Sequence, residues 1–191
     1  STFTEAKYLA INTETTGHIG YYSNYVTDYD DWYKFTLPAD SKILVTETTS
    51  ENLNSGVYLY DSNGTNQIAS EAGIKDGTDT LTFVNLAAGD YFVRIQNWNY
   101  SYGSYKLKIN TFPIELNNDA EPNSTFPEAN ILAINTETTG HIGYYSNYVT
   151  DYDDWFRVEI PAIGQIQVIE KTSADLYCGI YLYDGTETNQ I

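Results

Sequence analysis

The sequence contains no methionine, one cysteine and two histidines among its 191 residues. Because Cys178 is the only cysteine, no disulfide can form within the chain. No apolar run approaches the ~20 residues that a membrane-spanning helix requires, and no stretch resembles a signal peptide. A sequence that begins at Ser1 without methionine is typical of an excerpt from a longer, processed chain, so we expect any export signal to lie upstream.

Positive charge is also scarce, because 9 Lys and Arg residues face 26 Asp and Glu residues and the net charge is −17. Nucleic-acid binding needs a basic surface, so this composition argues against it. The same deficit disfavours adhesion to anionic membranes. A surface this acidic repels itself and attracts divalent cations.

One long stretch of the sequence occurs twice. Leu9–Trp32 returns letter for letter as Leu132–Trp155, an offset of 123 residues. This period is far longer than the roughly 20–50 residues of a solenoid repeat, so the repeated unit is a whole domain. We predict a complete repeat at 1–110, an acidic, proline-containing linker at 111–123, and a second repeat at 124–191 that lacks the counterpart of 69–110.

Alternating apolar and polar residues predict strands in both copies. The apolar positions of 33–37 are replaced by other apolar residues in 156–160, and the polar positions by other polar residues. Substitution that keeps alternate positions apolar and the positions between them polar indicates a half-buried strand. Further strands are expected around 17–22, 43–45, 57–59, 66–70, 81–83, 91–95 and 105–109, with a helical turn around Glu5–Leu9. About eight short strands per repeat predict an all-β fold, an antiparallel β-sandwich of the jelly-roll or Greek-key type, tandemly repeated.

Each copy of the identical block ends in a cluster of carboxylates before a tryptophan. The clustered residues are Asp28, Asp30 and Asp31 in the first copy, and Asp151, Asp153 and Asp154 in the second. Three carboxylates in four residues repel one another unless a cation lies among them, and hard oxygen ligands suit calcium. A solvated acidic loop is the alternative interpretation.

A second group of oxygen-bearing side chains precedes the second copy. Asp119, Glu121 and Asn123 alternate with Ala120 and Pro122. Alternate residues of an extended segment point the same way. We therefore expect these three side chains to share one face.

The order of these motifs resembles the bacterial pre-peptidase C-terminal domain. The resemblance rests on NDAEPNSTFPEAN, a Gly-x-Ile strand and DYDDWFRVEIP, and on YLYDSNG, AAGDYFVRIQNW and GSYKLKI of the first copy. It implies a secreted, calcium-stabilised β-sandwich, of the kind appended to bacterial peptidases and other exported proteins. It also implies a Ca²⁺ site formed by Glu121, Asn123, Asp151 and Asp154, with Asp119 and Asp153 as further ligands. In the first copy it points to Asp28 and Asp31.

Catalytic motifs are missing from the sequence. It has no Gly-x-Ser-x-Gly, no His-Glu-x-x-His and no glycine-rich phosphate loop. Asp30 and Asp31 are adjacent, and on a strand they would point to opposite faces, which does not suit paired-carboxylate glycoside cleavage. We predict that the chain is not an enzyme.

Aromatic residues gather in two loop regions of the first copy. The candidate contact residues are Tyr21, Tyr22 and Tyr25 in one region and Trp98, Tyr100 and Tyr102 in the other. Such residues can bind peptide, sugar or another protomer. They can equally cover the ends of the sandwich, and both interpretations stay open here.

Two functions are consistent with these observations. The first is a structural or adhesive module of a cell-surface stalk or extracellular fibre, in which neighbouring repeats or protomers complete the truncated second repeat with strands. The second is a substrate-binding accessory domain of a secreted peptidase or other hydrolase, with extracellular protein or polysaccharide as the ligand. Both place the protein outside the cell or at the cell surface.

Overall fold

The computed structural model describes residues 2–23, 26–75, 77–81, 84–114, 120–146, 148–173 and 176–191. The chain forms two compact units. Unit 1 comprises Ser1–Asn117 with His141–Tyr152, and unit 2 comprises Asn118–Gly140 with Asp153–Ile191. Part of the predicted second repeat thus folds within unit 1, while the domain boundaries drawn from the sequence stay a prediction.

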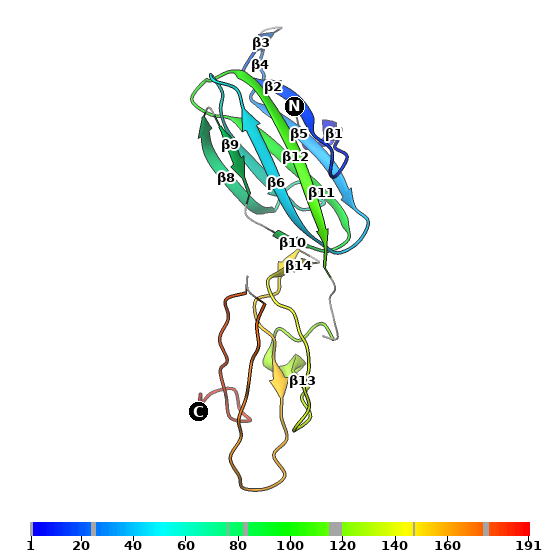
Figure 1. The fold of residues 1–191 in the computed structure, drawn as a ribbon, viewed down its shortest axis with the longest axis vertical. Helices are drawn as coiled ribbons and strands as arrows, with labels where there is room; N and C mark the ends of the chain where they lie inside the picture. Colours follow the sequence, from blue (N-terminus) through cyan, green and yellow to red (C-terminus); the bar gives the residue numbers. More distant parts are fainter. Residues whose placement is uncertain are drawn as a thin grey trace. The chain divides into compact units, whose positions relative to one another are not determined.

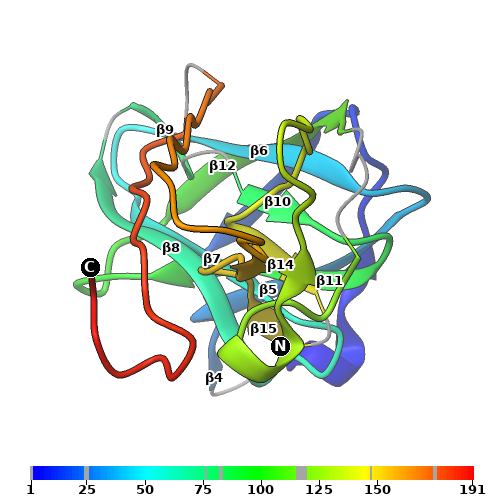
Figure 2. The ribbon, with the colours of Figure 1, turned by 90° about the horizontal axis from the view of Figure 1, so that it is seen from below.

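Unit 1 is a sandwich of two β-sheets (Figure 1). Figure 2 shows the sheets as two layers, with β6 and β12 in one and β5, β7 and β8 in the other. The first sheet has the order β1-β5-β11-β7-β8 and the second the order β15-β14-β10-β6-β12-β2, with β9 also paired to β6. These strands are β1 (Lys7–Tyr8), β2 (Thr15–Ile19), β5 (Asp30–Leu37), β6 (Ser41–Thr49), β7 (Asn54–Tyr60), β8 (Gln67–Lys75), β9 (Thr78–Thr80), β10 (Val84–Leu86), β11 (Gly89–Asn97), β12 (Gly103–Pro113), β14 (Tyr144–Ser146) and β15 (Val149–Thr150).

The long strands alternate between buried and more exposed positions, as a strand with one face on the core must. In β6 every second residue from Ser41 to Thr49 is buried. The predictions of an all-β fold and of a β-sandwich are therefore confirmed. Most pairings are antiparallel, but β1 with β5 and β10 with β14 are parallel. The core lies between the two sheets and includes Ile19, Phe35, Leu37, Ile43, Val45, Val57, Leu59, Val93, Ile95, Tyr105, Leu107 and Ile109.

Three details of the predicted elements differ in the structure. The helical turn lies at η1 (Phe3–Glu5), before the predicted Glu5–Leu9, because Lys7 and Tyr8 pair with β5 as a strand. The strand predicted at 66–70 extends through Lys75, since β8 follows β7 along its length. The strand predicted at 81–83 falls partly on residues 82 and 83, which lie outside the described residues.

A small hairpin, β3 (Tyr22–Ser23) with β4 (Val26–Thr27), stands apart from both sheets. It connects β2 of one sheet to β5 of the other. The same nine-residue sequence, 20–28, recurs as 143–151 and forms β14 and β15.

Unit 2 repeats several local features of unit 1 at positions 123 residues later. It contains η2 (Phe126–Glu128), β13 (Asn130–Ile131) and β16 (Phe156–Arg157). Asn130 pairs in parallel with Phe156, as Lys7 does with Tyr33. The apolar residues Ile160, Ile166, Val168 and Ile180 are exposed, whereas their unit 1 counterparts Leu37, Ile43, Val45 and Val57 are buried. No helix in the described part of the chain is long and apolar enough to cross a membrane.

Candidate metal centre

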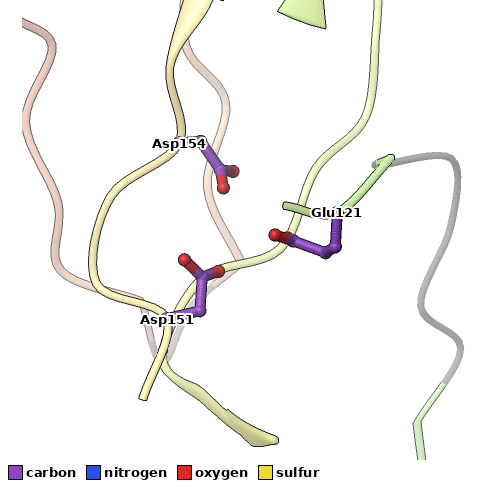
Figure 3. A group of neighbouring side chains, drawn as sticks. All are labelled: Glu121, Asp151 and Asp154. Carbon is purple, nitrogen blue, oxygen red and sulfur yellow. The ribbon is translucent and has the colours of Figure 1, made fainter. Parts of the chain in front are cut away.

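Three carboxylates from two separate segments lie together in the structure. One oxygen from each of Glu121, Asp151 and Asp154 lies within 4.8 Å of the others (Figure 3). Glu121 is exposed, while Asp151 and Asp154 are half-buried. Among the described residues, this is the only group of three acidic, histidine or cysteine side chains placed to share an ion.

Backbone hydrogen bonds hold the loop that carries the two aspartates. The amide of Asp151 donates to the carbonyl of Tyr144 at 2.9 Å, and the carbonyl of Asp151 accepts from Gly143 at 2.6 Å. These bonds close the β14–β15 hairpin and fix where Asp151 leaves it. Asp154 follows three residues later in the same loop.

The segment carrying Glu121 is tied to the residue after Asp154. The amide of Trp155 donates to the carbonyl of Asn123 at 2.8 Å. The amide of Asn123 in turn donates to Oε2 of Glu121 at 3.2 Å. Asn123 is fully buried. Two hydrogen bonds thus bring Glu121 toward the loop from a position thirty or more residues earlier in the chain.

Aromatic packing fixes the other side of this loop. The Trp155 ring lies edge-on to Phe126, with ring centroids 5.7 Å apart, and 5.3 Å from Tyr183. In unit 1, Trp32 has the equivalent neighbours Phe3 at 6.2 Å and Tyr60 at 5.0 Å. The tryptophan that ends each acidic motif is therefore an anchor of the fold.

The chemistry of the group fits a hard divalent cation. All three side chains offer carboxylate oxygens, which are the ligands that Ca²⁺ prefers, with carbonyl oxygens and water completing its six to eight positions. Three carboxylates so close together repel one another, and a cation between them relieves that repulsion. The donors contain no sulfur or imidazole, so the set does not suit zinc.

The acidic motif of the first copy has different partners. Asp30 accepts from Nε of Arg94 at 2.8 Å and forms an ion pair with its Nη2 at 2.8 Å. Asp31 is buried and accepts from the Tyr105 hydroxyl at 2.6 Å, with the Lys7 ammonium 3.9 Å away. Burial and the nearby Asp31 raise the pKa of Asp28 above its ordinary value.

The remaining predicted ligands of the second copy are Asp119, Asn123 and Asp153. Asp153 is exposed and lies outside the group of three carboxylates. Asn123 is adjacent to it through the backbone contacts described above. Asp119 lies outside the described residues.

The two aromatic loop regions of unit 1 meet in space. The Tyr21 ring lies 6.0 Å from Tyr102 and 5.4 Å from His18, both edge-on. Tyr21, Tyr22, Trp98, Tyr100 and Tyr102 are all exposed, and Tyr25 lies outside the described residues. Tyr144 and Tyr145, the counterparts of Tyr21 and Tyr22 in the second copy, were not among the predicted contact residues and are buried. Their sequence identity with Tyr21 and Tyr22 could have marked them as contact residues.

The fold and the site define an all-β sandwich domain with a candidate cation site in an acidic loop. Residues 29–97 match the family model of the bacterial pre-peptidase C-terminal domain, the family that the sequence motifs indicated. Domains of this family are non-catalytic parts of secreted peptidases, and the match concerns residues 29–97 of this chain.

Among the solved structures similar to part of the chain are a collagenase domain and a lysozyme inhibitor. The pre-peptidase C-terminal domain of a collagenase from Bacillus anthracis has 18% identity and a TM-score of 0.45, covering 55% of this chain and 94% of that one. PliG from Aeromonas hydrophila, a periplasmic inhibitor of g-type lysozyme, has 16% identity and a TM-score of 0.34, covering 55% of this chain and 95% of that one. The comparison with curated proteins finds no match.

Proposed function

We propose that the chain is a non-catalytic, calcium-stabilised repeat region of an exported protein. The observation that carries this proposal is the meeting of Glu121, Asp151 and Asp154 within 4.8 Å. Glu121 and the two aspartates would supply carboxylate oxygens, and bound Ca²⁺ would neutralise their mutual repulsion. The bound ion would hold the segment before the second repeat, which carries Glu121, against the acidic loop.

Thermal unfolding with and without calcium tests the site. A ligand at 100 times its Kd stabilises the folded state by about 2.7 kcal/mol, so millimolar Ca²⁺ should raise the Tm and EGTA should reverse the rise. Asp154→Ala should remove most of this gain. Equal Tm values for the wild-type chain in calcium and in EGTA would contradict the proposal.

Asp153→Ala is the matched control for this experiment. Asp153 adjoins Asp154 in the same loop, carries the same charge and lies outside the group. A general effect of lowering the acidic charge would appear in both variants. A specific site would leave the calcium response of Asp153→Ala close to that of the wild type.

The chain would act as a structural or adhesive module of a cell-surface stalk or extracellular fibre. The exposed apolar residues of unit 2, including Ile166 and Val168, support it, because their unit 1 counterparts are covered by strands. Strands from a neighbouring repeat or protomer would cover them. Sedimentation should detect self-association that Ile166→Lys with Val168→Lys weakens. A monomeric wild-type chain whose unit 2 amides resist exchange would argue against this role.

A second candidate is a substrate-binding accessory domain of a secreted hydrolase. The exposed aromatic group around Tyr21 and Tyr102 favours it, since exposed rings suit sugar and peptide ligands. Retention on insoluble collagen, chitin or cellulose, lost in Tyr102→Ala, would support this role. Passage of the wild-type chain through all three without retention would count against it.

A further inference from the structure

The chain contains one hairpin sequence in two different environments. Residues 20–28 and 143–151 are identical. Both segments form a two-stranded hairpin with the same register: Tyr22↔Thr27 and Ser23↔Val26 in the first, Tyr145↔Thr150 and Ser146↔Val149 in the second. Both are closed by a Gly amide that donates to an Asp carbonyl, at 2.7 Å from Gly20 and 2.6 Å from Gly143. The hairpin therefore keeps its conformation whether or not a sheet lies beside it.

The two copies differ in what covers their tyrosines. Tyr21 and Tyr22 are 46% and 68% exposed, whereas Tyr144 and Tyr145 are 7% and 9% exposed. Tyr145 belongs to the core cluster of unit 1. Because sequence and register are the same, the difference comes from the surface beside the second hairpin.

That surface is the edge of β10 that does not pair with β6. Asn85 and Leu86 pair in parallel with Tyr144 and Tyr145, and the amide of Ala87 donates to the carbonyl of Tyr145 at 3.1 Å. The other edge of β10 is paired with β6. The second hairpin thus extends the sheet by addition of strands to an edge.

Side chains of unit 1 complete this acceptor surface. Burial raises the pKa of Tyr144, and a hydrogen bond to Asp40 raises it further. Burial, with Tyr145 and Asp40 nearby, raises the pKa of Tyr91 to about 12. The Tyr148 hydroxyl lies 3.3 Å from Oγ of Ser62. The hairpin tyrosines therefore occupy a surface with defined polar partners.

The exposed hairpin and the acceptor edge lie at opposite ends of unit 1. Figure 1 shows β3 and β4 at one end of the sandwich and β10 with β14 at the other. A contact between two different surfaces of identical domains is heterologous and generates rows instead of closed dimers. The position of the hairpin at one end and of the β10 edge at the other suits a head-to-tail series of domains.

We propose that the exposed hairpin of residues 20–28 docks onto the β10 edge of a second copy of this domain. Tyr21 and Tyr22 would take the places that Tyr144 and Tyr145 occupy here, and Tyr22 would accept the hydrogen bond from the amide equivalent to Ala87. The occupant is a copy of this domain because the same sequence already fills that surface in unit 1. The proposal goes beyond the proposed function and does not depend on bound calcium.

The contact is small, so between separate chains it is weak. Within an array of repeats a short tether raises the effective concentration of the hairpin and makes docking efficient. In the wild-type chain the acceptor edge is filled by residues 143–151. A test between chains therefore needs an acceptor whose own hairpin is displaced.

The acceptor, which offers its β10 edge, is the full chain with four substitutions. Tyr144→Asp and Tyr145→Asp displace its own second hairpin from that edge. Tyr21→Asp and Tyr22→Asp prevent its first hairpin from docking onto another chain. Labelling it with ¹⁵N separates its peptides by mass from those of an unlabelled donor. The readout is hydrogen exchange of the peptide containing the Ala87 amide, measured in EGTA. The donor is the unlabelled wild-type chain in large excess.

We expect the Ala87 peptide of the acceptor to exchange fast alone and to be protected again by the wild-type donor. A donor carrying Tyr21→Asp and Tyr22→Asp should give no protection. Protection by both donors or by neither would overturn the proposal, and so would an acceptor already protected alone. If Tyr144→Asp with Tyr145→Asp unfolds the domain, Tyr144→Ser with Tyr145→Ser is used instead. Unfolding of this second variant as well would show that the hairpin is not a separable element and would also overturn the proposal.

Discussion

The Tyr105 hydroxyl donates a hydrogen bond of 2.6 Å to Oδ2 of Asp31 inside the core of unit 1. The Tyr33 hydroxyl lies 2.7 Å from that of Tyr105 and donates to it, since the Tyr105 proton is already engaged. Burial, with Tyr33 and Asp31 close by, raises the pKa of Tyr105 far above its ordinary value. The acidic motif of the first repeat is thus tied to β12 through a buried network.

Tyr105→Phe should lower the free energy of unfolding by about 1.5–3 kcal/mol, the usual range for a hydrogen bond to a charged group. The reason is that Asp31 stays buried and loses a close donor. Urea unfolding monitored by circular dichroism measures the change. Tyr100→Phe, at an exposed position, should leave stability nearly unchanged. Equal midpoints for the two variants would contradict the importance of the network.

Gly17→Ala should destabilise unit 1 by about 1–3 kcal/mol, as overpacking of a core does. Gly17 lies opposite Tyr105 in the β2–β12 pairing, and a Cβ at this position would overlap Cζ and Oη of the Tyr105 ring. The ring cannot move away easily because its hydroxyl is hydrogen-bonded on both sides. The control is Gly164→Ala, where an added Cβ meets nothing within 4 Å. Similar thermal unfolding of both variants would show that the ring has room to shift.

Ser55→Ala should cost about 1–3 kcal/mol, because a buried carboxylate loses a donor. Oγ of Ser55 on β7 donates to Oε1 of Glu47 on β6 at 2.6 Å, and the two strands belong to different sheets. In unit 2 the thiol of Cys178 donates to Glu170 at 2.6 Å, 123 residues later in the chain. Ser55→Cys should therefore cost less than Ser55→Ala, since a thiol still donates weakly. Chemical denaturation compares them, and a cysteine variant no more stable than the alanine one would be inconsistent with this role.

Asp90→Asn should cost about 0.5 kcal/mol near neutral pH, the scale of an exposed ion pair. Hydrogen bonds from Lys34 at 2.7 Å and Thr36 at 2.6 Å lower the pKa of Asp90 from its ordinary value of 3.8. A lowered pKa in the folded state means that the contribution is present above the unfolded-state pKa and disappears as the pH falls through the folded-state value. The difference between wild type and variant should vanish in strong acid. Urea titrations at several pH values measure it, and a difference that does not change with pH would exclude this origin.

The strands and their buried faces could be predicted from the sequence. Tyr33, Phe35 and Leu37 were assigned to one face by parity, and all three are buried in β5. The assignment succeeds because successive side chains of a strand point to opposite faces. The helical turn was placed too late because Lys7 and Tyr8 have no alternation of their own and become a strand only beside β5.

The sequence predicted that carboxylates form the candidate metal site, but it did not predict which of the neighbouring aspartates take part. The carboxylates of Glu121, Asp151 and Asp154 were all named from the sequence, and the structure brings them together. Asp153 belongs to the same motif but lies outside the group. Local spacing cannot distinguish adjacent aspartates when the loop conformation is set by hydrogen bonds from Gly143 and Trp155.

The amino-acid sequence alone predicts an all-β protein containing a duplicated block, because strand periodicity and sequence identity are local properties of the chain. The tertiary structure alone decided the role of each copy. In the first copy, Asp31 accepts a hydrogen bond from Tyr105, whereas its counterpart Asp154 in the second copy lies beside Glu121. Likewise, Tyr21 and Tyr22 are exposed while Tyr144 and Tyr145 are buried against β10. Identical residues differ in role because burial and hydrogen bonding depend on distant parts of the chain.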